Sequence, residues 1–180
     1  MTTSKSPFFV GTHEPESAHN TARYKYALAF IRNLRGEVLD CGEANVLKKL
    51  MEQKFEVEIK NTSGDLDIVS IEGKYNFILA FELLEHLMNP LWFLMQIRKA
   101  LKPDGSVFLS TPINKPKFLW RHDHFHEFDE YRLHWLIRKA GFEVVREERP
   151  RFYRITGIRP IIRLLLKTGT NFLELSPAGK

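Results

Sequence analysis

The sequence predicts an α/β fold with a mainly parallel central sheet flanked by helices. Segments with apolar residues at helical spacing alternate with short apolar segments, typical of buried strands, along almost the whole chain. With 180 residues and 43% hydrophobic positions, the chain is long enough for one core and too short for two comfortable ones. We therefore expect a flexible N-terminal arm over residues 1–20 and a single domain over residues 21–180.

The first half of the domain is expected to run helix, strand, helix, strand. A helix beginning at Thr21 stops at Gly36, since glycine is a common residue just after a helix. The apolar segment 37–41 (EVLDC) indicates a buried strand, and 45–55 (NVLKKLMEQKF) has the spacing of an amphipathic helix. Apolar and charged residues alternate over 55–59 (FEVEI), which favours a strand near a sheet edge.

The second half opens with a strand that is apolar throughout, over residues 75–81 (YNFILAF). A helix over residues 82–101 should follow it. The pair Asn89-Pro90 is expected to kink or split this helix, because proline lacks the amide proton that an interior helical position donates.

The last predicted elements begin with a turn at residues 102–105 (KPDG), which leads into a strand over 106–112 (SVFLSTP). A helix over 128–141 ends at a glycine, and a strand over 142–148 (FEVVREE) completes the pattern. Because strands and helices alternate, we expect parallel strands joined by right-handed crossovers.

The net charge of +5 permits an anionic partner but does not identify one. Basic residues gather near the C-terminus, where residues 157–169 (GIRPIIRLLLKTG) predict a short helix with an apolar face and basic edges. We interpret this part as a solvated edge of the domain. The alternative is a surface for phosphates, acidic lipid or nucleic acid, but no nucleic-acid fold signature accompanies it. The basic residues are Arg146, Arg149, Arg151, Arg154, Arg159, Arg163 and Lys167.

The sequence also suggests where the protein works. No segment approaches the roughly 20 consecutive apolar residues that a membrane-crossing helix needs. The N-terminus has no basic region followed by an apolar run, so we expect a cytoplasmic protein. Cys41 stands alone inside an apolar strand and is interpreted as a small buried residue rather than a nucleophile.

Functional residues are expected in the loops after residues 41, 81 and 112, because ligands of such sheets bind beyond the carboxyl ends of the strands. The first loop lacks the G-x-G-x-x-G pattern of dinucleotide sites, which disfavours NAD. After the apolar strand, Glu82, Glu85 and His86 share one face of the predicted helix. They could bind a divalent metal or supply a general base, or they could be first-turn acids with a capping histidine.

Three histidines at alternate positions form a second candidate group. In an extended segment His122, His124 and His126 would face the same side, where three imidazoles could hold zinc or nickel.

The ordered set of motifs resembles one known family. The segments EVLDCGEAN, YNFILAFELLEHLMNP, LWFLMQIRKALKPDGSVFLSTP and HFHEFDEYRLHWLIRKAGFEVV are similar to the motifs of class I S-adenosylmethionine-dependent methyltransferases. The likeness is to the branch that includes quinone-biosynthesis O-methyltransferases and small type 11 enzymes, and it covers residues 37–145. It implies a Rossmann-like fold, reduced around the second strand, with S-adenosyl-L-methionine as cofactor and S-adenosyl-L-homocysteine as product.

The resemblance also implies cofactor-binding residues, of which several depart from the family pattern. In the first loop Asp40 and Gly42 match a D-x-G-x-G-x-G motif, whereas Ala44 replaces the second glycine and adds a methyl group where the backbone approaches the ligand. Asn61 stands near the place of the acid that takes the ribose hydroxyls, and it lacks the charge of a carboxylate. The whole cofactor set is expected to comprise Asp40, Gly42, Ala44, Asn61, Asp65, Phe81 and Glu82.

Within that set, the resemblance assigns Asp65 to the adenine amino group. Asp67 is the alternative, and a solvated turn in which the Asp65 side chain bonds the backbone is a competing interpretation. Glu82 has a place in both the cofactor set and the catalytic set.

The catalytic candidates are His124, His86 and Glu82. Methyl transfer from a sulfonium depends mainly on alignment, and a base is needed only if the acceptor must lose a proton. The segment HFHEF resembles an H-x-x-E-F loop that closes over the site, which makes His124 and Phe128 lid or substrate-facing residues, and no metal is expected.

We therefore hypothesise a methyltransferase acting on a small molecule. A catalytically inactive protein of the same fold that serves as a binding module is the alternative. It is favoured by Ala44 and Val46 at glycine positions of the family pattern, by Asn61, and by Asn76 in the place of a frequent aspartate. A histidine-based metal-binding protein is a third interpretation.

Overall fold

The computed structural model describes residues 18–150, 152 and 169–179. Within them a six-stranded sheet has the order β2-β1-β3-β4-β6-β5. The strands are β1 (Val38–Asp40), β2 (Ile59–Asn61), β3 (Tyr75–Phe81), β4 (Leu101–Ile113), β5 (Phe142–Glu148) and β6 (Gly169–Pro177). The helices are α1 (Ala18–Phe30), α2 (Val46–Phe55), α3 (Pro90–Ala100) and α4 (Glu130–Lys139), with short 3-10 turns η1 (Leu84–His86) and η2 (Lys117–Leu119).

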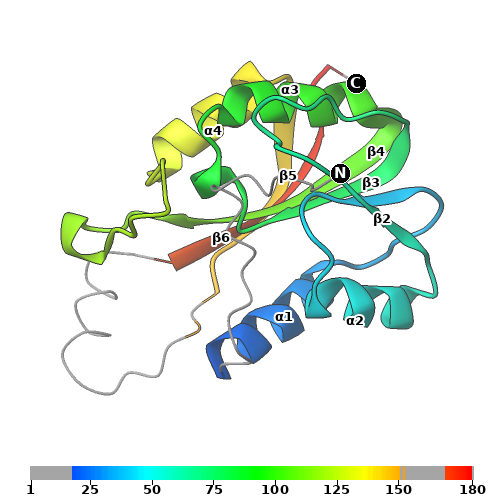
Figure 1. Ribbon diagram of the computed structural model, residues 1–180, viewed down its shortest axis with the longest axis horizontal. Helices are drawn as coiled ribbons and strands as arrows, with labels where there is room; N and C mark the ends of the chain where they lie inside the picture. Colours follow the sequence, from blue (N-terminus) through cyan, green and yellow to red (C-terminus); the bar gives the residue numbers. More distant parts are fainter. Residues whose placement is uncertain (1–17, 151, 153–168, 180) are drawn as a thin grey trace, which may run out of the picture.

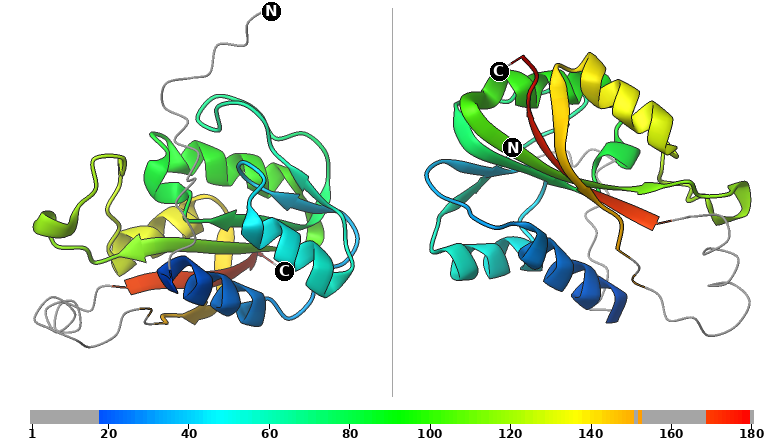
Figure 2. Two further views of the ribbon diagram at one scale, coloured as in Figure 1. Left: turned by 60° about the horizontal axis from the view of Figure 1, so that its bottom comes forward. Right: turned by 180° about the vertical axis from the view of Figure 1, so that it is seen from behind.

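Helices cover both faces of this sheet. In Figure 1 α1 and α2 lie below it and α3 and α4 above it, and Figure 2 shows the same two layers from behind. Strands β2, β1, β3 and β4 run parallel, whereas β6 is antiparallel to both β4 and β5. The structure thus confirms the predicted α/β fold with a mainly parallel sheet.

Each face of the sheet has its own core, because successive residues of a strand point to opposite sides. On β3, Ile78 packs toward α3 and α4 with Phe93, while Leu79 packs toward α1 and α2 with Met51. All four side chains are almost fully buried. Burial of such a side chain contributes about 1.5–3 kcal/mol, so both faces help to fix the order of the strands.

Side-chain caps set where the helices begin. Asn45 accepts a hydrogen bond from the backbone N–H of Lys48 at the start of α2, and Asn89 does the same for Trp92 at the start of α3. Pro90 occupies the first turn of α3, where its missing N–H costs nothing. The predicted split at Asn89-Pro90 is therefore confirmed.

The start of that predicted helix was wrong. Residues 82–100 form the 3-10 turn η1, a connection and then α3, rather than one kinked helix, and Leu101 already begins β4. Glu82 precedes η1 and has a φ of 49°, which no α-helix accommodates. Glu82, Glu85 and His86 consequently do not share a helical face.

The second strand and the fourth were also misplaced. Helix α2 continues through Phe55, and Glu56 ends it with a left-handed φ of 53°, so β2 begins only at Ile59. No helix or strand lies between β2 and β3, as the reduced fold predicts. Residues 102–105 belong to β4 instead of a separate turn, because Leu101 pairs with Tyr75 before an irregularity in the register.

The ends of the chain add one strand and leave one prediction outside the described part. Strand β6 was missed, although its buried Phe172, Leu173 and Leu175 make it the central partner of β4 and β5. The predicted basic helix over 157–169 lies almost wholly outside the described residues. Helix α1 already begins at Ala18, ahead of the expected Thr21, and the rest of the expected arm is also outside them.

Candidate functional site

The loop after β1 is the first part of the site, and we call residues Asp40–Asn45 with Asn61 and Thr62 the cofactor-loop region. Gly42 has a φ of 125°, a backbone conformation that side chains disfavour, and nothing lies within 4 Å of where a Cβ would stand. Ala44 is exposed in the same loop. The space on the Cβ side of Gly42 is therefore open.

Asp40 ends β1 and is buried. Burial raises the pKa of its carboxyl to about 7, although nearby Lys48 and a hydrogen bond from Asn61 oppose the rise. Asp40 and Asn61 are paired in register on the neighbouring strands β1 and β2. The two predicted cofactor residues are thus side by side.

The side-chain amide of Asn61 is hydrogen-bonded within the protein through both its oxygen and its nitrogen. Its Nδ2 donates to the carbonyl oxygen of Gly42 at 3.0 Å, and its Oδ1 accepts from Lys48 Nζ at 2.6 Å. The Gly42 N–H donates to Thr62 Oγ1 at 2.8 Å. Both backbone polar groups of the loop glycine are therefore bonded by residues at the end of β2.

The loop between β2 and β3 carries the two acids proposed for the adenine. Asp65 Oδ1 accepts from the N–H of Asp67 at 3.0 Å, which is the turn of the competing interpretation. The Asp67 carboxylate accepts from the N–H groups of Met88 and Asn89 at 3.0 and 2.8 Å. Asp67 therefore fixes this loop to the start of α3, while an adenine contact by Asp65 stays a prediction.

The end of β3 forms the next part of the site. Phe81 is half-buried, with its ring 6.0 Å from that of Phe172. Glu82 receives Arg23 Nη1 at 2.8 Å and Ser110 Oγ at 2.8 Å on its two carboxylate oxygens. These contacts tie α1 and β4 to the end of β3.

Glu85 lies deeper, as the second residue of η1. Its side chain is almost wholly buried and accepts a hydrogen bond from Thr111 Oγ1 at 2.9 Å. Burial and the nearby carboxylate of Glu82 raise the pKa of Glu85 well above its ordinary value. The repulsion between these two carboxylates favours a proton or a cation beside Glu85.

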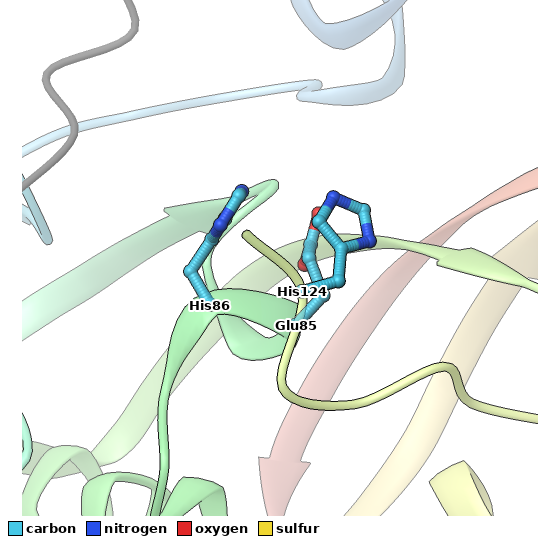
Figure 3. A group of neighbouring side chains, drawn as sticks. All are labelled: Glu85, His86 and His124. Atoms are coloured by element: carbon cyan, nitrogen blue, oxygen red, sulfur yellow. The ribbon is translucent and has the colours of Figure 1, made fainter. Parts of the chain in front are cut away.

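His86 and His124 stand beside this acid. Figure 3 shows Glu85 and His86 projecting from η1 and His124 from the loop before α4, with the three side chains drawn together. The two imidazole rings are 4.8 Å apart, and one ligand atom from each of the three residues lies within 4.8 Å of the others. This carboxylate and two imidazoles are suitable ligands for a transition metal.

The predicted histidine group was wrong in its membership. The segment around His124 is a turn rather than an extended strand, so alternate residues do not face one side. His122 is exposed, and His126 Nε2 lies 3.3 Å from the carbonyl oxygen of Met88. Only His124 of the three joins the potential ligand group in the described part of the chain, where its companions are Glu85 and His86.

Two residues of the site were missed from the sequence. Glu127 Oε1 is 3.1 Å from His124 Nδ1, and Lys115 Nζ is 3.4 Å from the same nitrogen. Burial raises the pKa of Glu127 and lowers the pKa of Lys115, and burial together with Lys115 lowers the pKa of His124 to about 4. His124 is therefore neutral at pH 7. Its position in H-x-x-E was the signal that could have identified Glu127.

We call the second group the ionisable cluster, and it lies at the ends of β3 and β4. The predicted residues therefore divide between two places: Asp40, Gly42, Ala44 and Asn61 belong to the cofactor-loop region, and Asp65 lies on the connection that follows β2. The ionisable cluster comprises Glu82, Glu85, His86, Lys115, His124 and Glu127.

Comparison with known proteins agrees with this geometry. A family model described as a methyltransferase domain matches residues 16–147. The chain therefore belongs to the methyltransferase domain family, of the class I, S-adenosylmethionine-dependent type that the motifs resemble. This membership supports S-adenosylmethionine as its cofactor.

Similar proteins include one curated relative and two solved structures. A ubiquinone biosynthesis O-methyltransferase of Cereibacter sphaeroides is 28% identical over 105 residues, which are 49% of this chain and 42% of the relative. The chain thus spans less than half the length of that relative.

An O-methyltransferase of a Brevibacillus brevis polyketide synthase, solved with S-adenosyl-L-homocysteine, superposes with a TM-score of 0.61 at 12% identity, over 86% of this chain and 72% of its own. The [4+2]-cyclase SpnF superposes with a TM-score of 0.60 at 13% identity, over 88% and 82%. These likenesses show the shared Rossmann-like fold.

Among the helices that the structure describes, none has the length and apolar character needed to span a bilayer. The cytoplasmic location and the anionic partner of the basic segment stay predictions.

Proposed function

We propose that the chain is an S-adenosylmethionine-dependent methyltransferase that transfers a methyl group in line to a hydroxyl of a small molecule. One observation carries the proposal: the open loop at Gly42 and the ionisable cluster lie at the carboxyl ends of adjacent parallel strands. This is the edge where ligands of open α/β sheets bind. The family supports the cofactor, and the activity named for the relative from Cereibacter supports an oxygen acceptor.

The residues of the cofactor-loop region suit the cofactor. The open space at Gly42 allows a ligand to approach the backbone, and Asp40 and Asn61 stand beside it. We assign the adenine contact to Asp65, and Phe81 and Glu82 complete the set. When bound, the cofactor supplies an electrophilic methyl group. The thioether that remains is a good leaving group and needs no acid.

His124 is the base that we favour for an acceptor hydroxyl. It is neutral at pH 7, so the ring is in the form that can receive a proton, but its pKa of about 4 makes it a weak base at that pH. Glu127 Oε1 near its Nδ1 orients the ring. Because Nδ1 of His124 lies near both Glu127 and Lys115, its Nε2 is the atom that would receive the proton. The other two candidates are engaged as well. His86 Nδ1 lies 2.8 Å from the carbonyl oxygen of Asp123, and both oxygens of Glu82 are bonded.

Calorimetric titration with S-adenosylmethionine and S-adenosylhomocysteine tests the proposal. Binding should be lost in Gly42→Val, because valine strains a φ of 125° and fills the open space. It should be weakened in Asp65→Ala. An exposed substitution in the next helix, Lys49→Ala, is the matched control. A folded wild-type protein that binds neither compound at millimolar concentration would sink the enzyme hypothesis.

The alternative is an inactive binding module, and the hydrogen bonds of Gly42 favour it. The N–H and the carbonyl of this glycine are already paired with Thr62 and Asn61. One fold commonly carries several functions, as the similarity to a cyclase illustrates. Cofactor binding without transfer to any member of a panel of hydroxyl compounds, assayed with radiolabelled methyl donor, would support this alternative.

A divalent metal is a second candidate ligand, favoured by the arrangement of Glu85, His86 and His124. Titration with Zn²⁺ or Mn²⁺, followed by thermal unfolding, should stabilise the wild type and leave His124→Ala unchanged. Equal stabilisation of both proteins would argue against this site.

A further inference from the structure

Lys115 is the lysine of the ionisable cluster, and it lies just beyond the end of β4. Its side chain is only 20% exposed. In the described part of the chain its Nζ has one hydrogen-bond partner, His124 Nδ1 at 3.4 Å, while Glu127 Oε1 lies 4.0 Å away. Strong hydrogen bonds from nitrogen are about 2.7–3.2 Å long. The ammonium group is therefore largely buried but poorly hydrogen-bonded.

The position of the proton on His124 decides whether its contact with Lys115 is a hydrogen bond at all. Glu127 Oε1 lies closer to Nδ1, at 3.1 Å, and a carboxylate oxygen accepts a hydrogen bond from this nitrogen. An Nδ1 that donates to Glu127 has no lone pair left for Lys115. The same tautomer leaves Nε2 without a proton, as the proposed base requires. In this state Lys115 has no hydrogen-bond acceptor among the residues that the structure describes.

An ammonium group in this position suits an anionic ligand. Lys115 has three N–H donors, and their burial without acceptors costs free energy that a ligand oxygen can offset. An anionic oxygen forms charge-assisted hydrogen bonds of about 2.7–2.9 Å with such a group. A ligand carboxylate can therefore come closer to Lys115 than Glu127 does.

The segment that carries Lys115 is positively charged. Residues 114–126 leave the end of β4 and project beyond the sheet in Figures 1 and 2. Arg121 donates to both carboxylate oxygens of Asp123 at 2.9 Å, so these two charges offset each other. The remaining charges of the segment are Lys115 and the exposed Lys117. This surplus of positive charge favours the approach of an anion.

We propose that Lys115 binds an anionic group of the methyl acceptor, and that this acceptor is a small acid with a hydroxyl group, such as a hydroxycarboxylate. The inference rests on the proposed function, since it places the methyl acceptor at the ionisable cluster. Lys115 Nζ lies beside the imidazole of His124. One small molecule can therefore present its anionic group to Lys115 and its hydroxyl to Nε2 of that ring. Lys115 thus determines which acceptor binds, while His124 acts on the hydroxyl.

Calorimetric titration of the full chain, saturated with S-adenosylhomocysteine, tests this proposal with two matched pairs of compounds. The pairs are 3-hydroxybenzoate with 3-hydroxybenzamide and lactate with lactamide, which differ within each pair in charge and keep the hydroxyl. The wild type should bind the acid of at least one pair about tenfold more tightly than its amide, because only the acid pairs a negative charge with Lys115. Equal affinities in both pairs, or no binding of any of the four compounds at millimolar concentration, would overturn the proposal.

Variants show whether the preference comes from Lys115 itself. Lys115→Met keeps the apolar stem and should abolish the preference for the acid, whereas Lys115→Arg keeps the charge and should retain it. Lys117→Met removes an exposed charge from the same segment and should bind like the wild type. A preference that survives in Lys115→Met or disappears in Lys117→Met would contradict the proposal. Circular dichroism checks folding, and if Lys115→Met does not fold, the wild type and Lys115→Arg still decide.

The affinity for S-adenosylhomocysteine, measured first in the same series, separates this inference from the function on which it rests. Cofactor binding together with equal affinities for acid and amide would overturn the role of Lys115 and keep the proposed function. Absence of cofactor binding by the folded wild type would overturn both, because the acid would then have no methyl donor beside it.

Discussion

The cofactor-loop region and the ionisable cluster lie at the same edge of the sheet and treat their polar groups differently. In the first, Asn61, Thr62 and Lys48 pair the backbone and side-chain groups with one another. In the second, ionisable groups are buried close together, and Glu127 Oε2 has no hydrogen-bond partner within the described protein. Buried polar atoms are usually hydrogen-bonded, so an unpaired carboxylate oxygen of this kind indicates a place that suits the binding of a ligand or a proton.

The two regions therefore keep or lose function for different physical reasons. The polar groups of the cofactor-loop region are hydrogen-bonded within the protein, so a ligand that uses the Gly42 backbone has to replace existing bonds. Burial of the ionisable cluster costs folding free energy, and neutralisation of its charges reduces that cost. Experiments that change the charge or the packing of each region separately test this contrast.

The largest expected effect is a pH dependence of stability that comes from Asp40. Its folded-state pKa of about 7 lies above the ordinary value of 3.8, so the folded protein holds this proton more tightly than the unfolded chain. Its contribution to the free energy of unfolding is fully present below pH 3.8 and is lost as the pH rises through 7. The loss is on the order of 4 kcal/mol at about 1.4 kcal/mol per pKa unit.

Urea unfolding at a series of pH values checks this expectation by comparing the wild type with Asp40→Asn. The asparagine cannot ionise, so the difference in unfolding free energy between the two proteins should change by that amount between pH 4 and pH 8. A constant difference across this range would show that Asp40 is already ionised at pH 4 in the folded protein. The ionisable cluster would then be the one of the two regions that buries ionisable groups at a cost.

A smaller effect is expected from Glu85 in the ionisable cluster. Glu85→Ala leaves a cavity and removes the acceptor of Thr111, which should lower the unfolding free energy at pH 7 by about 3 kcal/mol. Glu85→Gln keeps the volume and the neutral state that the raised pKa favours, and it should cost less than about 1 kcal/mol. If the glutamine were as destabilising as the alanine, Glu85 would have to be charged in the folded protein.

How far the sequence predicts this molecule depends on the range of the interactions. The parallel sheet and the split at Asn89-Pro90 follow from local patterns and from the geometry of α/β sheets. The placement of Asp40 and Asn61 in one region follows from the family resemblance. Strand β6 was missed, because its pairing with β4 and β5 joins segments far apart in the chain.

The contacts within the site depend even more on tertiary structure. The positive φ of Glu82 and the approach of Lys48 to Asn61 arise from how α2 and β3 meet their neighbours. No spacing of residues in the sequence predicts either of these two features. The pairing of His124 with Glu127 is the exception, since both belong to one short motif.

The smallest expected effect on stability comes from Ala44→Gly, which restores the second glycine of the family pattern. Ala44 is exposed in the loop, so its removal should cost about 0.5–1 kcal/mol, mainly through the added freedom of the unfolded chain. Calorimetry with S-adenosylhomocysteine should nevertheless show tighter binding, because the methyl group no longer limits the approach of the ligand to the backbone. If Ala44→Gly left the affinity unchanged, the departure from the family pattern at residue 44 would not limit binding, and the hydrogen bonds that Gly42 makes with Asn61 and Thr62 would remain as the limit.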